Sequence, residues 1–154
     1  MTDSADADAL QRLHHHFRSM PPVAALAITV DGLHDGRLRL SAPLSAHVND
    51  KGCAFGGSLV SLMTLAGWGL VTTRLEAAGI DADVFVADSA VRYLAPLYED
   101  LRADAALADD ADWDALLDAL RTRGRGRIAL RAEVRAADGT VATAMDARFA
   151  AKLR

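Results

Sequence analysis

Residues 52–73 read GCAFGGSLVSLMTLAGWGLVTT and contain no charged side chain. The stretch is about as long as a bilayer-crossing helix, which needs roughly 20 residues. Its glycines, serines and threonines make it far less apolar than a span built from Leu, Ile and Val, and no second segment could accompany it in a bilayer. A helix that is apolar nearly all round in a water-soluble chain is most simply enclosed by its own protein. We therefore expect a buried helix over 57–78, ended by Gly79, and no membrane span.

The segments on either side of this helix predict strands and two short amphipathic helices. Apolar and polar residues alternate from Val23 onward, and the turns Asp35-Gly36 and Asp138-Gly139 predict hairpins. The expected strands are 23–30, 37–44, 82–94, 100–108 and two C-terminal strands, and the expected short helices are 6–17 and 112–121. Only the helix over 57–78 is apolar enough to be enclosed, and an antiparallel sheet curled around it is the economical packing. The sequence therefore predicts an α+β hotdog fold with one domain over 1–154.

Composition and charge exclude several classes of protein. The chain is 51% hydrophobic and 25% charged, which is typical of a folded domain rather than a disordered one. The formal net charge of -4 offers no overall attraction to nucleic acid or to an anionic membrane. A single cysteine, Cys53, allows no internal disulfide, and the first residues do not resemble a secretion signal. We therefore expect a cytoplasmic protein with no nucleic-acid partner.

The pair Gly56-Gly57 stands where the apolar helix is expected to begin. Adjacent glycines let a ligand approach the backbone closely, and the unpaired N–H groups of a helix start can bind an oxyanion or a phosphate. The alternative is a tight turn whose glycines only pack against the sheet. The glycine pair alone does not decide between the two.

A spaced signature and three short stretches make the resemblance to a known family specific. Asn49, Gly52, Gly56 and Gly57 have the spacing of the Asn-x-x-Gly-x-x-His-Gly-Gly signature of hotdog acyl-CoA thioesterases. FGGSL at 55–59, TLAGW at 64–68 and DSAVRYLAP at 88–96 resemble the thioesterase family typified by the YiiD C-terminal domain. The resemblance covers most of the chain, with the motifs in the same order.

The resemblance implies roles for individual residues. The N–H of Gly56, with Gly57 beside it, would bind the thioester carbonyl, and Asn49 would orient the thioester or an attacking water. This sequence has Phe55 at the position of the signature His, and Thr64 where such enzymes often have Asp or Glu. A threonine hydroxyl is a poor general base but can hold a water molecule.

Asp88 is the best carboxylate available for the remaining chemistry. It follows a stretch that is apolar from Val84, where desolvation could raise its pKa. The alternative is an ion pair with Arg92, four positions further on the same strand face. We expect the substrate-binding residues to be Phe55, Ser58, Arg92, Arg125 and Arg127. Arg125 and Arg127 could clamp the phosphates of coenzyme A or face an acidic carrier protein, or they could be solvated turn residues.

Other reactive or aromatic side chains have simpler explanations. Cys53 is a possible nucleophile, but a small loop residue is the simpler interpretation, because only His47 lies near it in sequence. Tyr93, Trp68 and Met63 are expected in the core or in the walls of an acyl pocket.

The leading hypothesis is a thioesterase that hydrolyses a small-molecule acyl thioester, carried by coenzyme A or by an acyl-carrier protein. It needs no metal, and no cofactor beyond the coenzyme A or phosphopantetheine carried by its substrate. The resemblance implies a homodimer or a dimer of dimers, with sheets joined edge to edge and the site at the interface. The alternative hypothesis is a non-catalytic module that binds acyl-CoA or acyl-carrier protein beside an acyltransferase.

Overall fold

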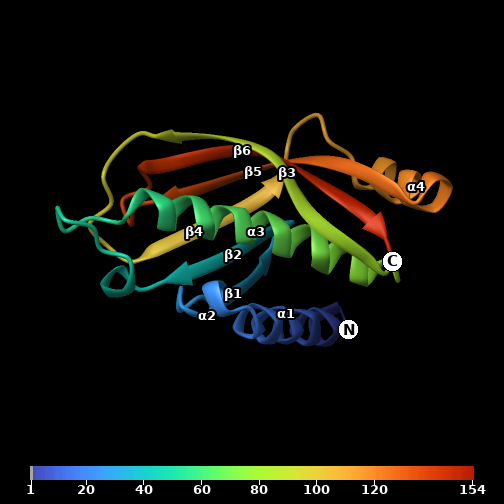
Figure 1. Ribbon diagram of the computed structural model, residues 1–154, viewed down its shortest axis with the longest axis horizontal. Helices are drawn as coiled ribbons and strands as arrows, with labels where there is room; N and C mark the ends of the chain where they lie inside the picture. The colour runs from blue at the N-terminus through green and yellow to red at the C-terminus, as the bar shows by residue number, and fades with distance from the viewer. Residues whose placement is uncertain (1) are drawn as a thin grey trace.

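The computed structural model describes residues 2–154 and consists of one antiparallel sheet with a long helix across it (Figure 1). The sheet has six strands in the order β1-β2-β4-β5-β6-β3. The strands are β1 (Thr29–His34), β2 (Arg37–Ala42), β3 (Ala82–Tyr93), β4 (Leu101–Leu107), β5 (Arg125–Arg135) and β6 (Val141–Leu153). The helices are α1 (Thr2–Ser19), α2 (Pro21–Ala24), α3 (Gly56–Ala77) and α4 (Trp113–Arg123), with a 3-10 turn over Leu44–Ala46. The predicted α+β hotdog arrangement is confirmed.

Helix α3 is the central helix, and two glycines let it approach the sheet closely. A Cβ atom at Gly67 would lie 2.6 Å from the Phe149 ring, and one at Gly69 would lie 2.8 Å from Cδ2 of Leu38. No real side chain tolerates such distances, so these positions fix how close the helix can pack. The helix begins and ends one residue before the predicted bounds. None of the helices in residues 2–154 is long and apolar enough to cross a membrane.

The N-terminal segment covers the side of α3 that the sheet leaves open. Leu13 and Phe17 of α1 are buried in the core, and the ring of Phe17 lies 6.0 Å from that of Trp68 on α3. The prediction of a strand beginning at Val23 is wrong, because Pro21 and Pro22 start the short helix α2. Proline favours the first positions of a helix, since it lacks the N–H that would be unpaired there. The first strand begins only at Thr29.

The last two strands form the longest hairpin, and their alternation matches the prediction. Ile128, Leu130 and Val134 of β5 are buried, as are Met145 and Phe149 of β6. Because the buried residues of both strands face α3, the residues between them form the outer face of the sheet. Of the predicted site residues on strands, only those on the inner face of the sheet can lie near α3.

Strand β3 lies at one edge of the sheet and pairs only with β6 among residues 2–154. Large apolar side chains on it remain exposed, including Phe85 at 60% and Tyr93 at 57%. An edge strand carries a row of unpaired backbone N–H and C=O groups, which can pair with another strand. This edge runs past the start of α3, because Tyr93 touches Gly56 there.

Candidate active site

The start of α3 exposes two backbone N–H groups without a partner in the described part of the chain. Its N-cap residue, Phe55, has no side chain that can accept a hydrogen bond, and its carbonyl accepts from the N–H groups of Ser58 (3.0 Å) and Leu59 (3.1 Å). The N–H groups of Gly56 and Gly57 are left over. They lie at the positive end of the helix dipole, which favours a negative charge.

Two aromatic rings flank these N–H groups. A Cβ atom at Gly57 would lie 2.6 Å from the ring of Phe55, and one at Gly56 would lie 3.3 Å from the ring of Tyr93. The Tyr93 hydroxyl donates to the Gly56 carbonyl over 3.1 Å. Both rings are more than half exposed, so Tyr93 is not a core residue. The glycines therefore keep the backbone accessible between two apolar walls.

The loop before α3 is shaped by Asn49. Its Oδ1 accepts from the backbone N–H of Lys51 (2.8 Å) and of Cys53 (3.1 Å), while its Nδ2 donates to Sγ of Cys53 (3.2 Å). The carboxamide oxygen is therefore engaged within the loop, and Cys53 is buried. In this arrangement Asn49 positions the loop.

His47 and Ser58 form a polar pair that the sequence interpretation missed. The Nδ1 atom of His47 lies 2.8 Å from Oγ of Ser58, and its Nε2 lies 2.7 Å from the carbonyl oxygen of Leu26. A β-bridge between Val48 and Ala54 folds the loop back, and so brings His47 beside the first turn of α3. The available signal was a histidine and a serine on either side of a loop that ends in two glycines. The sequence pattern alone relates His47 only to the nearby Cys53.

Thr64 lies two turns further along α3 and faces β6. Its hydroxyl is 3.8 Å from Sδ of Met145 and is part-buried. Thr143, on the same inner face of β6, is fully buried, and its hydroxyl has no hydrogen-bond partner. Thr64 therefore lies deeper along the helix, beside the sheet, rather than next to Gly56.

Asp88 lies on the outer face of the sheet, and two expectations about it are wrong. A β-bulge separates Val86, which is opposite the buried Phe149, from Asp88, which is opposite the exposed Arg148. The bulge reverses the alternation, so Asp88 points away from α3. The hydrogen bond from Arg148 holds the pKa of Asp88 below its ordinary value, so burial does not raise it. Its partner is Arg148, and Arg92 instead pairs with Asp146 over 3.2 Å.

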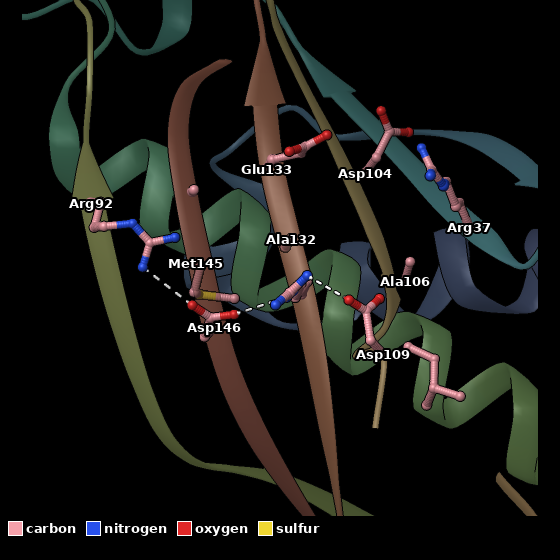
Figure 2. Close-up of a pocket in the computed structure, with 12 residues that line it drawn as sticks. Arg37, Arg92, Asp104, Ala106, Asp109, Ala132, Glu133, Met145 and Asp146 are labelled. Atoms are coloured by element: carbon pink, nitrogen blue, oxygen red, sulfur yellow. Dashed lines mark hydrogen bonds and ion pairs between the residues drawn. The ribbon is translucent and has the colours of Figure 1, made fainter. Parts of the chain in front are cut away.

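The outer face also carries a polar hollow of about 450 Å³, shown in Figure 2. Four of its charged side chains form a chain of ion pairs: Arg131 bridges Asp109 and Asp146, each over 3.3 Å, and Asp146 also pairs with Arg92. Because these carboxylates are matched by arginines and lie away from α3, the hollow is a network of surface ion pairs. Asp88 and Arg92 lie on this outer face, and neither reaches Gly56 or Gly57.

Arg125 and Arg127 begin β5 and are exposed. Arg125 is opposite Lys152 near the end of β6, and that end also pairs with the first residues of β3, which follow α3. The two arginines therefore lie near the far end of α3 within one chain. Ser58, Phe55 and Gly57 are the predicted residues that the structure gathers around Gly56.

The family comparison decides what kind of protein has this helix start. Residues 8–152 match the family model described as "Putative thioesterase (yiiD_Cterm)". The chain belongs to this thioesterase family. The predicted resemblance to the YiiD C-terminal domain is thereby confirmed, and it covers nearly the whole hotdog domain.

Solved structures agree with the fold of this thioesterase family. A protein of Shewanella oneidensis described as a putative thioesterase is 28% identical, with a TM-score of 0.82, and the match covers 96% of this chain and 99% of that one. A Chlorobaculum tepidum protein of unknown function is 24% identical, with a TM-score of 0.85 and coverage of 99% and 96%. A thioesterase of Haemophilus influenzae is 16% identical, with a TM-score of 0.71 and coverage of 90% and 87%. The last two matches support the fold alone.

Proposed function

We propose that this protein hydrolyses an acyl thioester, carried by coenzyme A or by an acyl-carrier protein, at the start of α3. The observation that carries the proposal is the pair of unpartnered N–H groups of Gly56 and Gly57, in a chain that belongs to a thioesterase family. Attack on a thioester carbonyl produces a tetrahedral oxyanion, and preorganised N–H donors stabilise it more than they stabilise the ground state.

The surroundings of the glycine pair suit a thioester. Phe55 and Tyr93 give it apolar walls, and a low-polarity site strengthens the hydrogen bonds to a developing oxyanion. Thr64 lies deeper along α3 and faces Met145 of β6, and an acyl chain would extend toward this pair from the helix start. The thiol half of the substrate would remain on the solvent side, beside the exposed rings.

The proposed working unit is a homodimer joined through β3. The free edge of this strand and its exposed Phe85, Val86 and Tyr93 offer both backbone hydrogen bonds and apolar area to a second copy. Because Tyr93 also touches Gly56, pairing at this edge would place the site at the junction of two chains. Light scattering of the purified protein would give its mass in solution, and a monomer would overturn this part of the proposal.

A specific observation also supports the second candidate, a module that binds acyl thioesters without turning them over. Thr64 stands where related enzymes carry an acidic residue, and Asp88 faces the other side of the sheet. A site with oxyanion donors and no base would hold a thioester carbonyl and leave it intact. Its partner would be an enzyme that transfers the acyl group.

One assay separates the two candidates. Free thiol is measured with acyl-CoAs from acetyl to palmitoyl and with acyl-carrier protein bearing the same acyl groups, and calorimetry measures binding in parallel. Catalytic thiol release supports the hydrolase. Binding of any acyl thioester without turnover, in a protein that remains folded, would establish the binding module instead.

A further inference from the structure

We propose that Ser58 is the residue that accepts the acyl group, with His47 as the base that takes its proton. This inference rests on the proposed thioesterase function and names its nucleophile. It would make hydrolysis a two-step reaction through an ester on Ser58.

The hydrogen bonds of His47 decide where the protons lie. The Leu26 carbonyl can only accept, so Nε2 of His47, 2.7 Å away, carries a proton and donates it. In the neutral ring Nδ1 then has a free lone pair. The Ser58 hydroxyl, 2.8 Å from Nδ1, therefore donates its proton to the histidine. A hydroxyl whose proton points at an imidazole lone pair is the arrangement that activates a serine nucleophile.

The burial of the two side chains fits a buried base and an accessible nucleophile. His47 is buried, with only 6% of its surface exposed, whereas Ser58 is partly exposed in the first turn of α3. The backbone holds the base in place, because the N–H of Phe55 donates to the His47 carbonyl over 2.8 Å. A substrate would therefore reach the serine first, with the histidine behind it.

Ser58 is also close in sequence to the proposed oxyanion donors. It follows Gly56 and Gly57 directly, and all three residues belong to one helical turn. A thioester carbonyl oxygen bound by the glycine N–H groups would hold its carbon near this turn. Neither Thr64 nor Asp88 is placed there, since Thr64 faces Met145 and Asp88 lies on the outer face.

The proposed reaction balances without any further reagent. Ser58 Oγ bonds to the thioester carbon as its proton moves to Nδ1 of His47, and the carbonyl π electrons move onto oxygen. The C–S bond then breaks, and the leaving thiolate takes the proton from His47. In the second half, water attacks the ester and gives a proton to His47, which returns it to Ser58 as the acid leaves.

The competing explanation is a purely structural bridge in which His47 ties the segment at Leu26 to the start of α3. Such a bridge would affect stability but would form no covalent intermediate. Ser61 provides a matched control, because it is a partly buried serine on the next turn of the same helix. The Ser61→Ala change removes the same hydroxyl from a position away from His47.

The experiment looks for the covalent ester and for the reactivity of the hydroxyl. The full-length protein is mixed with acetyl-CoA and quenched in acid, and peptide mass spectrometry locates any acetyl group. A fluorophosphonate, which labels activated serines, is tested in parallel on the wild type, Ser58→Ala, Ser61→Ala and His47→Gln. Thermal unfolding reports whether each variant is folded. Thiol release from acetyl-CoA is measured on the same samples.

We expect acetyl and fluorophosphonate adducts on Ser58 in the wild type and in Ser61→Ala, and none in Ser58→Ala. Thiol release should fall by several orders of magnitude in folded Ser58→Ala, since removing a serine nucleophile costs about 10⁶-fold in kcat. An absence of both adducts on Ser58 in the wild type would overturn the inference. If His47→Gln does not fold, the comparison of Ser58→Ala with Ser61→Ala still decides.

The outcomes also separate this inference from the proposed function. Turnover that persists in folded Ser58→Ala would leave the thioesterase standing and overturn the role of Ser58. Labelling of Ser58 in a wild-type protein that releases no thiol from any acyl thioester would do the reverse. It would support the Ser58–His47 pair and remove the thioesterase function.

Discussion

Helices α3 and α4 begin in opposite ways. At α4 the N-cap residue Asp112 turns its carboxylate onto the N–H of Asp114, 3.0 Å away, so the helix supplies its own negative charge. At α3 the N-cap residue is Phe55, which has no acceptor, and the two residues that follow are glycines. A helix start that only has to be stable takes a capping side chain, which is worth about 1 kcal/mol. The uncapped start of α3 forgoes that stabilisation and keeps its N–H groups available.

The most direct test of this difference is to give α3 an N-cap carboxylate like the one that α4 has. In Phe55→Asp, the new carboxylate would accept from the N–H groups of the first turn and compete with the oxyanion. We expect kcat/KM for thiol release to fall by about 10²–10³, the usual cost of losing an oxyanion donor. The thermal midpoint should be unchanged or higher, because capping stabilises a helix.

Phe55→Leu is the matched control, since it changes the same wall without adding an acceptor. It should lose far less turnover than Phe55→Asp, since it adds no acceptor to the helix start. Full activity in Phe55→Asp would show that the open helix start takes no part in the reaction.

The two glycines at the start of α3, Gly56 and Gly57, are expected to differ from each other in a smaller but measurable way. In Gly57→Ala the added Cβ would lie 2.6 Å from the Phe55 ring, which must move. In Gly56→Ala it would lie 3.3 Å from the Tyr93 ring, which has to shift by only a few tenths of an ångström. We expect Gly57→Ala to lower kcat/KM by about tenfold or more, because small displacements at a reacting centre are costly.

Gly56→Ala should then lose less activity than Gly57→Ala. Steady-state kinetics with one acyl-CoA, at matched thermal stability, would measure the ranking. The reverse ranking would indicate that Tyr93, rather than Phe55, is the wall that positions the substrate.

Removing the cap of α4 should change stability and leave the chemistry alone. Asp112→Ala exposes the N–H of Asp114 without a partner, and we expect a loss of about 1 kcal/mol in the free energy of unfolding. Urea unfolding would measure it, with Asp118→Ala on the exposed side of the same helix as the control. Turnover at 25 °C should match that of the wild type, and a selective loss of kcat would mean that α4 takes part in the reaction.

Local sequence patterns were enough to predict most of the fold. The uncharged run that became α3, and the strict alternation of β5 and β6, are signals that each segment carries by itself. The stretch from Val23 to Ile28 misled the prediction because its alternation looked like a strand, while Pro21 and Pro22 had already started a helix. In that case the chemistry of proline outweighed a short hydrophobic period.

The candidate site was harder to predict, because its decisive contacts are not local. His47 meets Ser58 only because the bridge between Val48 and Ala54 closes the loop. Asp88 was expected to contribute to the site because it follows a stretch that is apolar from Val84. One extra residue at a β-bulge reverses the face, and that bulge is a property of the pairing of β3 with β6. The register of β3 against β6 cannot be derived from the residues of β3 alone.

Replacing Asp88 should therefore have the smallest effect of the proposed changes. It also tests whether the outer face of the sheet takes part in the reaction. Its folded-state pKa lies below the ordinary value of 3.8, because Arg148 binds the charged form. The ion pair therefore contributes its full stability above about pH 4, and this contribution is lost as the pH falls through the lowered pKa. In Asp88→Asn, the difference in urea midpoint from the wild type should be small near neutral pH, since exposed pairs contribute little, and should shrink toward zero in acid.

Thiol release by Asp88→Asn should match that of the wild type, because the Asp88 side chain points away from α3. A large fall in kcat would instead put Asp88 in the reaction and require that the outer face of β3 meet a substrate, most simply one bound across the edge of a second chain.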